Sequence, residues 1–157
     1  MCTITIVTPT YNRGNLLPHL YESLCQQTVK DFQWLIIDDG SQDNTCTIVK
    51  SMSNAPFLLE YYYKENGGKH TALNYSHPYI KGDLVFIVDS DDTLASDAVE
   101  TILEDWQLYK NKKEIGVISY LRGRLDGSSV ANSTAPDRYI STHLDYRINH
   151  NIVGDMA

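Results

Sequence analysis

The fold of this chain is decided by residues 84–92, which are Leu84-Val85-Phe86-Ile87-Val88-Asp89-Ser90-Asp91-Asp92. The first five are apolar without polar alternation, and they predict a buried strand. Three carboxylates follow within four positions, and this concentration of negative charge costs free energy unless a cation or an array of donors neutralises it. A hard divalent metal is the natural partner, because such ions bridge protein carboxylates to substrate phosphates. The alternative is a solvated acidic turn, since Asp and Ser are common in turns.

Strands and helices alternate along the chain. The strand pattern occurs in residues 3–8, 33–37, 57–63, 84–88 and 115–120. Helical patterns occupy residues 15–27, about 43–52, a short stretch through Ala72 and Leu73 that ends before Pro78, and 96–110. This alternation predicts an α/β fold with a mostly parallel central sheet flanked by helices. Beyond Gly123 the pattern weakens, and the tail is polar and irregular.

Polar clusters follow four of the predicted strands. They are residues 8–13 (TPTYNR), 38–41 (DDGS), 65–69 (ENGGK) and 89–92 (DSDD). In open parallel sheets, ligands bind outside the carboxyl ends of the strands, at a switch in strand order. We therefore expect the four loops to converge on one rim of the sheet, and four clusters in register are stronger evidence for a site than one.

The residue types in these clusters are suited to a nucleotide. Asp39 offers an acceptor for an imide N–H such as that of uracil, and Tyr11 offers a flat ring for stacking. Lys69 begins a helix after two glycines, where backbone N–H groups and the ammonium can meet phosphate or a base edge. Asp89 and Asp91 point to the same side if the backbone stays extended, so one can bind a ribose hydroxyl and the other a metal. The alternatives are a turn or capping acid for Asp39, ordinary packing for Tyr11 and a solvated Lys69.

Composition narrows the function classes. The 157 residues fit one domain, and the formal net charge of -7 argues against binding to a nucleic-acid backbone. There is no run of about 18 apolar residues, so no transmembrane segment is expected, and the N-terminus lacks the pattern of a signal peptide. Cys2, Cys25 and Cys46 are widely spaced and are expected to be reduced thiols, which fits a cytoplasmic location.

The ordered set of motifs resembles the inverting family 2 glycosyltransferases of the GT-A fold. The motifs are residues 8–13 (TPTYNR), 38–43 (DDGSQD), 66–68 (NGG) with Asn74, and 82–83 (GD) leading into 89–92 (DSDD). The resemblance covers about residues 1–125 and implies a Rossmann-like GT-A fold that binds a nucleoside-diphosphate sugar, most often a UDP-sugar, with Mn²⁺ or Mg²⁺. It implies metal-dependent transfer of the sugar, with inversion, to a hydroxyl of an unknown carbohydrate, lipid or protein acceptor.

The resemblance also implies roles for single residues of the nucleotide site. Pro9 and Tyr11 would line the nucleoside pocket, and Asp39 would hold the base. Lys69 would approach the nucleotide, and Asp89 would lie near the ribose and the metal.

The metal ligands implied by the resemblance are Asp91 and Asp89, whereas the catalytic base is not identified. In this family the base is an Asp or Glu of the acceptor-side half, well past the Asp-x-Asp motif, and we expect it beyond Ala157. Within the chain the weak candidate is Asp155, besides Asp137 and Asp145. We therefore expect residues 1–125 to form the donor-binding half and residues 126–157 to begin an acceptor-side half that is cut short.

Two other functions stay open. Residues 85–93 also fit the Asp-x-Asp-x-Thr motif of a haloacid-dehalogenase-type phosphatase with Asp89 as nucleophile, but that motif normally opens its domain, and here three strand–helix units precede it. A non-catalytic nucleotide-sugar-binding module shares every donor-site feature and lacks only turnover. Association with the inner face of a membrane also stays open, because acceptors of such enzymes are often membrane-borne.

Overall fold

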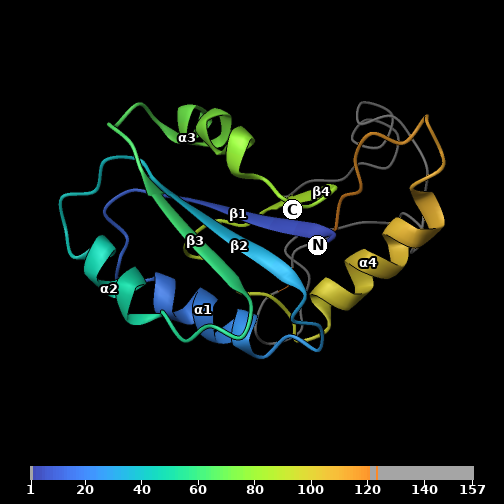
Figure 1. The fold of residues 1–157 in the computed structure, drawn as a ribbon, viewed down its shortest axis with the longest axis horizontal. Coiled ribbons are helices and arrows are strands. Elements are labelled where there is room, and N and C mark those ends of the chain that lie inside the picture. Colours follow the sequence, from blue (N-terminus) through green and yellow to red (C-terminus); the bar gives the residue numbers. More distant parts are fainter. Residues whose placement is uncertain (1, 121–122, 124–157) are drawn as a thin grey trace. The chain divides into compact units, whose positions relative to one another are not determined.

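Within the part of the chain that the structure describes, four parallel strands form the sheet that positions the site (Figure 1). The computed structural model describes residues 2–120 and 123. In the order β3-β2-β1-β4, the strands are Leu58–Tyr63, Phe32–Asp38, Ile4–Thr10 and Leu84–Ile87. Strand β1 pairs in parallel with both β2 and β4, and β2 pairs in parallel with β3. The predicted α/β fold with a mostly parallel sheet is confirmed.

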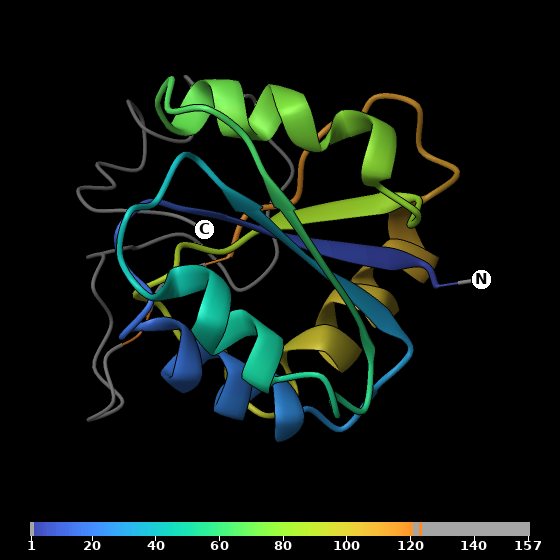
Figure 2. The same cartoon turned by 60° about the vertical axis from the view of Figure 1, so that its left-hand side comes forward.

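Helices cover both faces of this sheet (Figures 1 and 2). Helix α3 lies on one face, and helices α1, α2 and α4 lie on the other. Their bounds are Leu17–Cys25 for α1, Thr45–Ser51 for α2, Lys69–Ser76 for α3 and Ala98–Tyr109 for α4, with a 3-10 turn, η1, at His77–Tyr79. The switch in strand order falls at β1, because the chain moves outward through β2 and β3 and then crosses back to place β4 on the other side.

The two central strands carry the core. All seven residues of β2 are buried, and six of the seven residues of β1 are buried, because both strands have a neighbour on each edge and helices on each face. From α1, the side chains of Leu17, Leu20 and Leu24 are fully buried, as expected for one face of an amphipathic helix. This rigid centre fixes the positions of the loops that follow each strand.

The prediction of a buried strand at residues 84–88 is only partly right. The strand β4 exists, but it pairs with β1 on one edge, and Val85 and Ile87 are 48% and 45% exposed. Leu84 and Phe86 are half-buried, so β4 is an edge strand within the described residues. An apolar run predicts that a strand is suited to burial, but whether both faces are covered depends on neighbours that a single segment does not reveal.

The prediction of a fifth strand at residues 115–120 is wrong. This segment joins no strand among the described residues, and Val117 is 80% exposed. Its β-branched and apolar composition favours an extended chain, yet a strand exists only where another strand accepts its hydrogen bonds. The prediction rested on local composition alone, which does not show whether a partner strand is available.

The chain divides into two compact units, Met1–Lys112 and Lys113–Ala157. The sheet, its helices and the residues of the site discussed below belong to the first unit. The predicted boundary between a donor-binding half and an acceptor-side half at residue 125 stays a prediction.

Among the helices of the described residues, none combines the length and the apolar composition that spanning a membrane requires. The cytoplasmic location stays a prediction.

Gly82, which precedes β4, packs closely against the backbone of Thr3 and Ile4, and this contact leads to a testable prediction. A Cβ added to Gly82 would lie 2.7 Å from the carbonyl carbon of Ile4 and 2.8 Å from the carbonyl oxygen of Thr3, both of which are backbone atoms. We expect Gly82→Ala to lower the free energy of unfolding by about 2 kcal/mol, because the two strands must move apart. Gly116→Ala is the control, since its Cβ would meet nothing within 4 Å. Urea unfolding that gives equal midpoints for both variants would contradict this strand contact.

Candidate functional site

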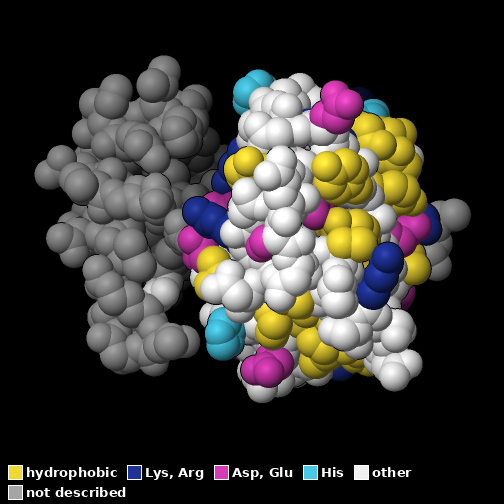
Figure 3. Space-filling view, turned by 90° about the vertical axis from the view of Figure 1, so that its left-hand side faces the viewer, with side chains coloured by type: hydrophobic (Ala, Val, Ile, Leu, Met, Phe, Trp, Pro, Cys, Tyr) yellow, Lys and Arg dark blue, Asp and Glu magenta, His cyan; other side chains and the backbone are white. Residues whose placement is uncertain are grey.

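The loops that follow the four strands contact one another at the carboxyl ends of the sheet. Figure 3 views the molecule from the left-hand side of Figure 1, where the loops after β1, β2 and β3 lie, and acidic and basic side chains lie side by side on this face. The contacts between loops are Asn12 with Ser41, Gly67 and Gly68 with Asp39, Lys69 with Asp89, and Arg13 with Asp91. The predicted convergence on one rim is therefore confirmed.

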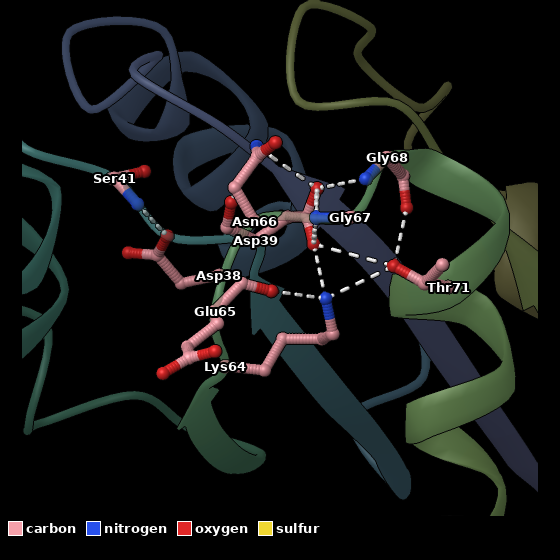
Figure 4. Close-up of polar contacts among 9 residues, drawn as sticks. All are labelled: Asp38, Asp39, Ser41, Lys64, Glu65, Asn66, Gly67, Gly68 and Thr71. Carbon is pink, nitrogen blue, oxygen red and sulfur yellow. Dashed lines mark hydrogen bonds and ion pairs between the residues drawn. The ribbon is translucent and has the colours of Figure 1, made fainter.

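Asp39 is the most heavily bonded residue of this rim (Figure 4). It is buried, and its Oδ1 accepts from the Lys64 ammonium at 2.5 Å. Its Oδ2 accepts from the backbone N–H of Gly68 at 2.6 Å and from the Asn66 amide at 3.2 Å, and the Gly67 N–H lies 3.1 Å from Oδ1. One carboxylate thus joins the end of β2 to the whole loop between β3 and α3.

These contacts keep Asp39 ionised. Burial alone would raise the pKa of Asp39, but the hydrogen bonds from Lys64, Gly67 and Gly68 and the charge of Lys64 outweigh it, and the pKa lies below its ordinary value. From the sequence, Asp39 is expected to be an acceptor for an imide N–H, and that role stays a prediction. A carboxylate has about four acceptor sites, and here they already serve donors of the same chain.

Lys64 is a residue of this site that the sequence analysis missed. Its ammonium also donates to Thr71 Oγ1 at 2.9 Å and to the carbonyl oxygen of Glu65, and the side chain is only 15% exposed (Figure 4). A signal was present in the sequence, because Lys64 directly follows β3 at the same rim as the clusters that were singled out. A lysine next to a strand end is common, however, and only its contact with Asp39 distinguishes it.

Asp38, the last residue of β2, has a structural role, because its carboxylate binds donors of the same chain. Its Oδ2 accepts from the Tyr61 hydroxyl at 2.6 Å. Its Oδ1 accepts from the N–H of Ser41 at 2.7 Å (Figure 4). Burial, followed by the neighbouring carboxylate of Asp38, raises the pKa of Tyr61, so this hydroxyl stays protonated and donates. Asp38 therefore closes the turn after β2 and ties it to β3.

Two glycines allow these loops to come close. Gly40 has φ 88° and Gly68 has φ 91°, in the region that favours glycine. A Cβ on Gly40 would lie 2.7 Å from the backbone nitrogen of Asn66. Larger residues at position 40 would push the loop after β2 away from the loop after β3.

The two carboxylates of the Asp-x-Asp motif are each paired with a basic side chain. Lys69 Nζ lies 2.5 Å from Asp89 Oδ1, and Arg13 Nη1 lies 3.0 Å from Asp91 Oδ2. The backbone does not stay extended here, because the N–H of Asp92 donates to the carbonyl oxygen of Asp89 at 3.1 Å and closes a turn. The expected common direction of Asp89 and Asp91 was derived from an extended backbone, and that premise is wrong.

The chemistry of these oxygen ligands fits a hard divalent cation. No group of three or more His, Cys, Asp and Glu side chains that could hold a metal occurs within the described residues. Mg²⁺ characteristically takes one or two protein carboxylates and completes its shell with water and substrate phosphates. Asp89 and Asp91 meet that requirement only if a phosphorylated substrate supplies further oxygens.

The remaining predicted residues lie at the end of β1 or outside the described part. Pro9 is half-buried within β1, and Tyr11, directly after this strand, is exposed. Between them, Thr10 is buried, and its hydroxyl oxygen has no hydrogen-bond partner among the residues described. The candidate bases, which are Asp137, Asp145 and Asp155, lie outside the described residues.

Comparison with known proteins agrees with this arrangement. A family model described as "Glycosyl transferase family 2" matches residues 5–154. Chondroitin synthase from Pasteurella multocida is 34% identical over 130 residues, which are 82% of this chain and 13% of that protein. The chain spans between 13% and 40% of the length of eight curated relatives that it matches.

Two solved structures share the fold. TarS from S. aureus in complex with UDP superposes with a TM-score of 0.65 at 23% identity, over 74% of this chain and 38% of that one. The mannosyltransferase PcManGT from Pyrobaculum calidifontis, in complex with GDP-Man and Mn²⁺, superposes with a TM-score of 0.66 at 22% identity, over 77% of this chain and 35% of that one. These matches confirm the predicted GT-A fold. The match to the glycosyl transferase family model does not favour the phosphatase alternative.

The ion pair between Asp39 and Lys64 leads to a prediction about the free energy of unfolding. We expect Lys64→Met to lower the free energy of unfolding at pH 7 by roughly 3 kcal/mol, because a buried carboxylate loses its counter-ion. The same change at Lys50, an exposed lysine in the last turn of α2, should have little effect. Urea unfolding of both variants measures the difference.

The pH dependence of that difference follows from the lowered pKa of Asp39. A carboxyl whose pKa is lower in the folded protein contributes stability above its unfolded value of about 3.9, and this contribution is lost as the pH falls through the folded value. The penalty of Lys64→Met should therefore be full at neutral pH and shrink in acid as Asp39 becomes protonated. A penalty that stays constant from pH 7 to pH 2.5 would contradict the ion pair as its cause.

Proposed function

Because the chain belongs to glycosyl transferase family 2, we propose that it forms the donor-binding part of an enzyme that transfers a sugar from a nucleoside diphosphate to an acceptor hydroxyl. The observation that carries this proposal is the convergence of Asp89 and Asp91 with Lys69 and Arg13 on one rim of the parallel sheet. Two carboxylates for a cation and two basic side chains for phosphate are the groups that a metal-bound diphosphate needs.

The proposed nucleotide is uridine diphosphate. Support comes from the structures of TarS in complex with UDP and with UDP-GlcNAc. The PcManGT structure is a complex with GDP-Man, so a guanosine donor is the competitor to test. Pro9 and the exposed ring of Tyr11 would line the nucleoside pocket. A uracil imide N–H would reach Asp39 by replacing one of its present donors, and the 3.2 Å bond from Asn66 is among the longest of them.

The proposed cofactor is Mn²⁺ or Mg²⁺ at Asp91 and Asp89. When bound, such an ion neutralises negative charge on the diphosphate leaving group. Lys69, at the N-terminus of α3, would add a positive charge beside the nucleotide, while Asp89 would face the ribose as well as the metal. The structure of PcManGT, which shares the fold, is a complex with GDP-Man and Mn²⁺ and supports this choice.

The proposed reaction inverts the anomeric carbon. The acceptor oxygen forms a bond to this carbon as the bond to the diphosphate oxygen breaks, and the electron pair leaves with the diphosphate. The acceptor proton passes to a carboxylate base, which we place beyond residue 157, with Asp155 as the weaker candidate within the chain. The acceptor would be a carbohydrate, a lipid or a protein.

Calorimetric titration with UDP, with and without Mn²⁺, tests the donor site. We expect Mn²⁺ to raise UDP affinity by about tenfold or more, because metal and diphosphate bind each other as well as the protein. Asp91→Ala should abolish this dependence. Asp83→Asn is the matched control, since Asp83 is exposed and precedes β4 at the opposite end of the strand.

Two results would contradict the proposal in different ways. If neither UDP nor GDP binds the folded wild-type chain, the assignment of a nucleotide site is wrong. If UDP binds with the same affinity with and without Mn²⁺, and with and without Asp91→Ala, the assignment of the metal site is wrong. Binding with no transfer to any acceptor is the behaviour of a non-catalytic binding module.

A further inference from the structure

We propose that Arg13 is a diphosphate-binding residue that is held on Asp91 until metal and nucleotide arrive. This inference rests on the proposed function and deepens it, because it says how Arg13, one of the two basic side chains of the proposed diphosphate site, changes its partner when metal and nucleotide bind. In the structure, the ion pair joins Arg13 Nη1 to Asp91 Oδ2 at 3.0 Å. Asp91 is thus engaged by a cation of the protein at the place where the proposed metal would bind.

The backbone around Arg13 is firmly held. On one side, the N–H of Asn12 donates to Ser41 Oγ at 2.8 Å, and the Asn12 side chain accepts from the N–H of Gln42 at 2.8 Å. On the other side, the N–H of Gly14 donates to Asp43 at 3.2 Å. The loop after β1 is therefore fixed to the loop after β2, and Arg13 projects from an anchored position.

The side chain of Arg13, in contrast, is weakly held. The side chains of Arg13 and Asp91 are each 49% exposed. Ion pairs with this exposure contribute little net stability, because water competes for both charges. The guanidinium can therefore leave Asp91 without disturbing the loop that carries it.

Electrostatics favours an exchange of partners on binding. A divalent cation on Asp91 would lie close to the positive charge of Arg13, and like charges on one carboxylate repel. A diphosphate brings several negative oxygens to the same place, and a planar guanidinium binds phosphate through two parallel hydrogen bonds. Asp91 would then hold the metal, and Arg13 would hold the phosphate.

This exchange predicts opposite effects of one substitution on two ligands. Arg13→Gln removes the competing cation, so Mn²⁺ alone should bind about two- to fivefold more tightly, the worth of a half-exposed ion pair. The same change removes a phosphate contact, so UDP at saturating Mn²⁺ should bind about tenfold or more weakly, the worth of a charge-assisted hydrogen bond. Misfolding would weaken both ligands, and it cannot produce opposite signs.

The experiment titrates Mn²⁺ alone and then UDP at saturating Mn²⁺ into wild type, Arg13→Gln, Arg13→Lys and Lys50→Gln. The loss of the free Mn²⁺ signal in electron paramagnetic resonance measures metal binding, and calorimetry measures UDP binding. Arg13→Lys keeps the charge but not the planar fork, so it should bind Mn²⁺ like wild type and recover only part of the UDP affinity. Lys50→Gln removes the same charge from the exposed end of α2 and should change neither affinity.

The outcomes separate this inference from the proposed function. Wild-type protein that binds neither UDP nor GDP with Mn²⁺ would overturn both. Wild-type binding of UDP that Arg13→Gln leaves unchanged would overturn the role of Arg13 alone. A substitution that weakens Mn²⁺ and UDP together would also overturn it, because Arg13 would then support the site without exchanging partners.

Discussion

The ionised carboxylate of Asp39 is the constraint on which this rim depends. It lies at the end of a fully buried strand, and it binds the ammonium of Lys64 together with the backbone amides of Gly67 and Gly68. These donors come from the loop that leads into α3, so a single buried anion sets both the conformation of that loop and the start of the helix. Lys69 is the first residue of that helix, and its reach toward Asp89 follows from this anchoring.

A second feature of the rim is its balance of charge. The Asp-x-Asp carboxylates repel each other, and each of them is paired with one basic residue. Arg13 comes from the loop after β1, and Lys69 is the first residue of α3. The buried ion pair of Asp39 and Lys64 holds its loops in one conformation. The ion pairs of Asp89 and Asp91 are partly exposed, so these carboxylates can exchange partners at a low cost in free energy. The nucleoside end of the proposed site is therefore rigid, and the diphosphate end is adaptable.

Sequence reasoning succeeded where a local pattern determines the outcome. The alternation of strands and helices predicted the parallel sheet, and the polar clusters predicted the rim, because parallel strands must end on the same side. It failed where the outcome depends on a distant neighbour. The exposure of Val85 on β4 and the missing strand at residues 115–120 reflect which partners are available, and the saturation of Asp39 reflects a lysine 25 positions away in the chain.

The most direct test of the central claim is a crystal structure of the chain with UDP and Mn²⁺, in which the anomalous scattering of manganese locates the ion. The account predicts one manganese peak at about 2.0–2.6 Å from a carboxylate oxygen of Asp91, with the diphosphate on its other side and the uridine next to Tyr11 and Asp39. A manganese ion away from the Asp-x-Asp turn, or a nucleotide bound away from the carboxyl ends of the strands, would contradict the account.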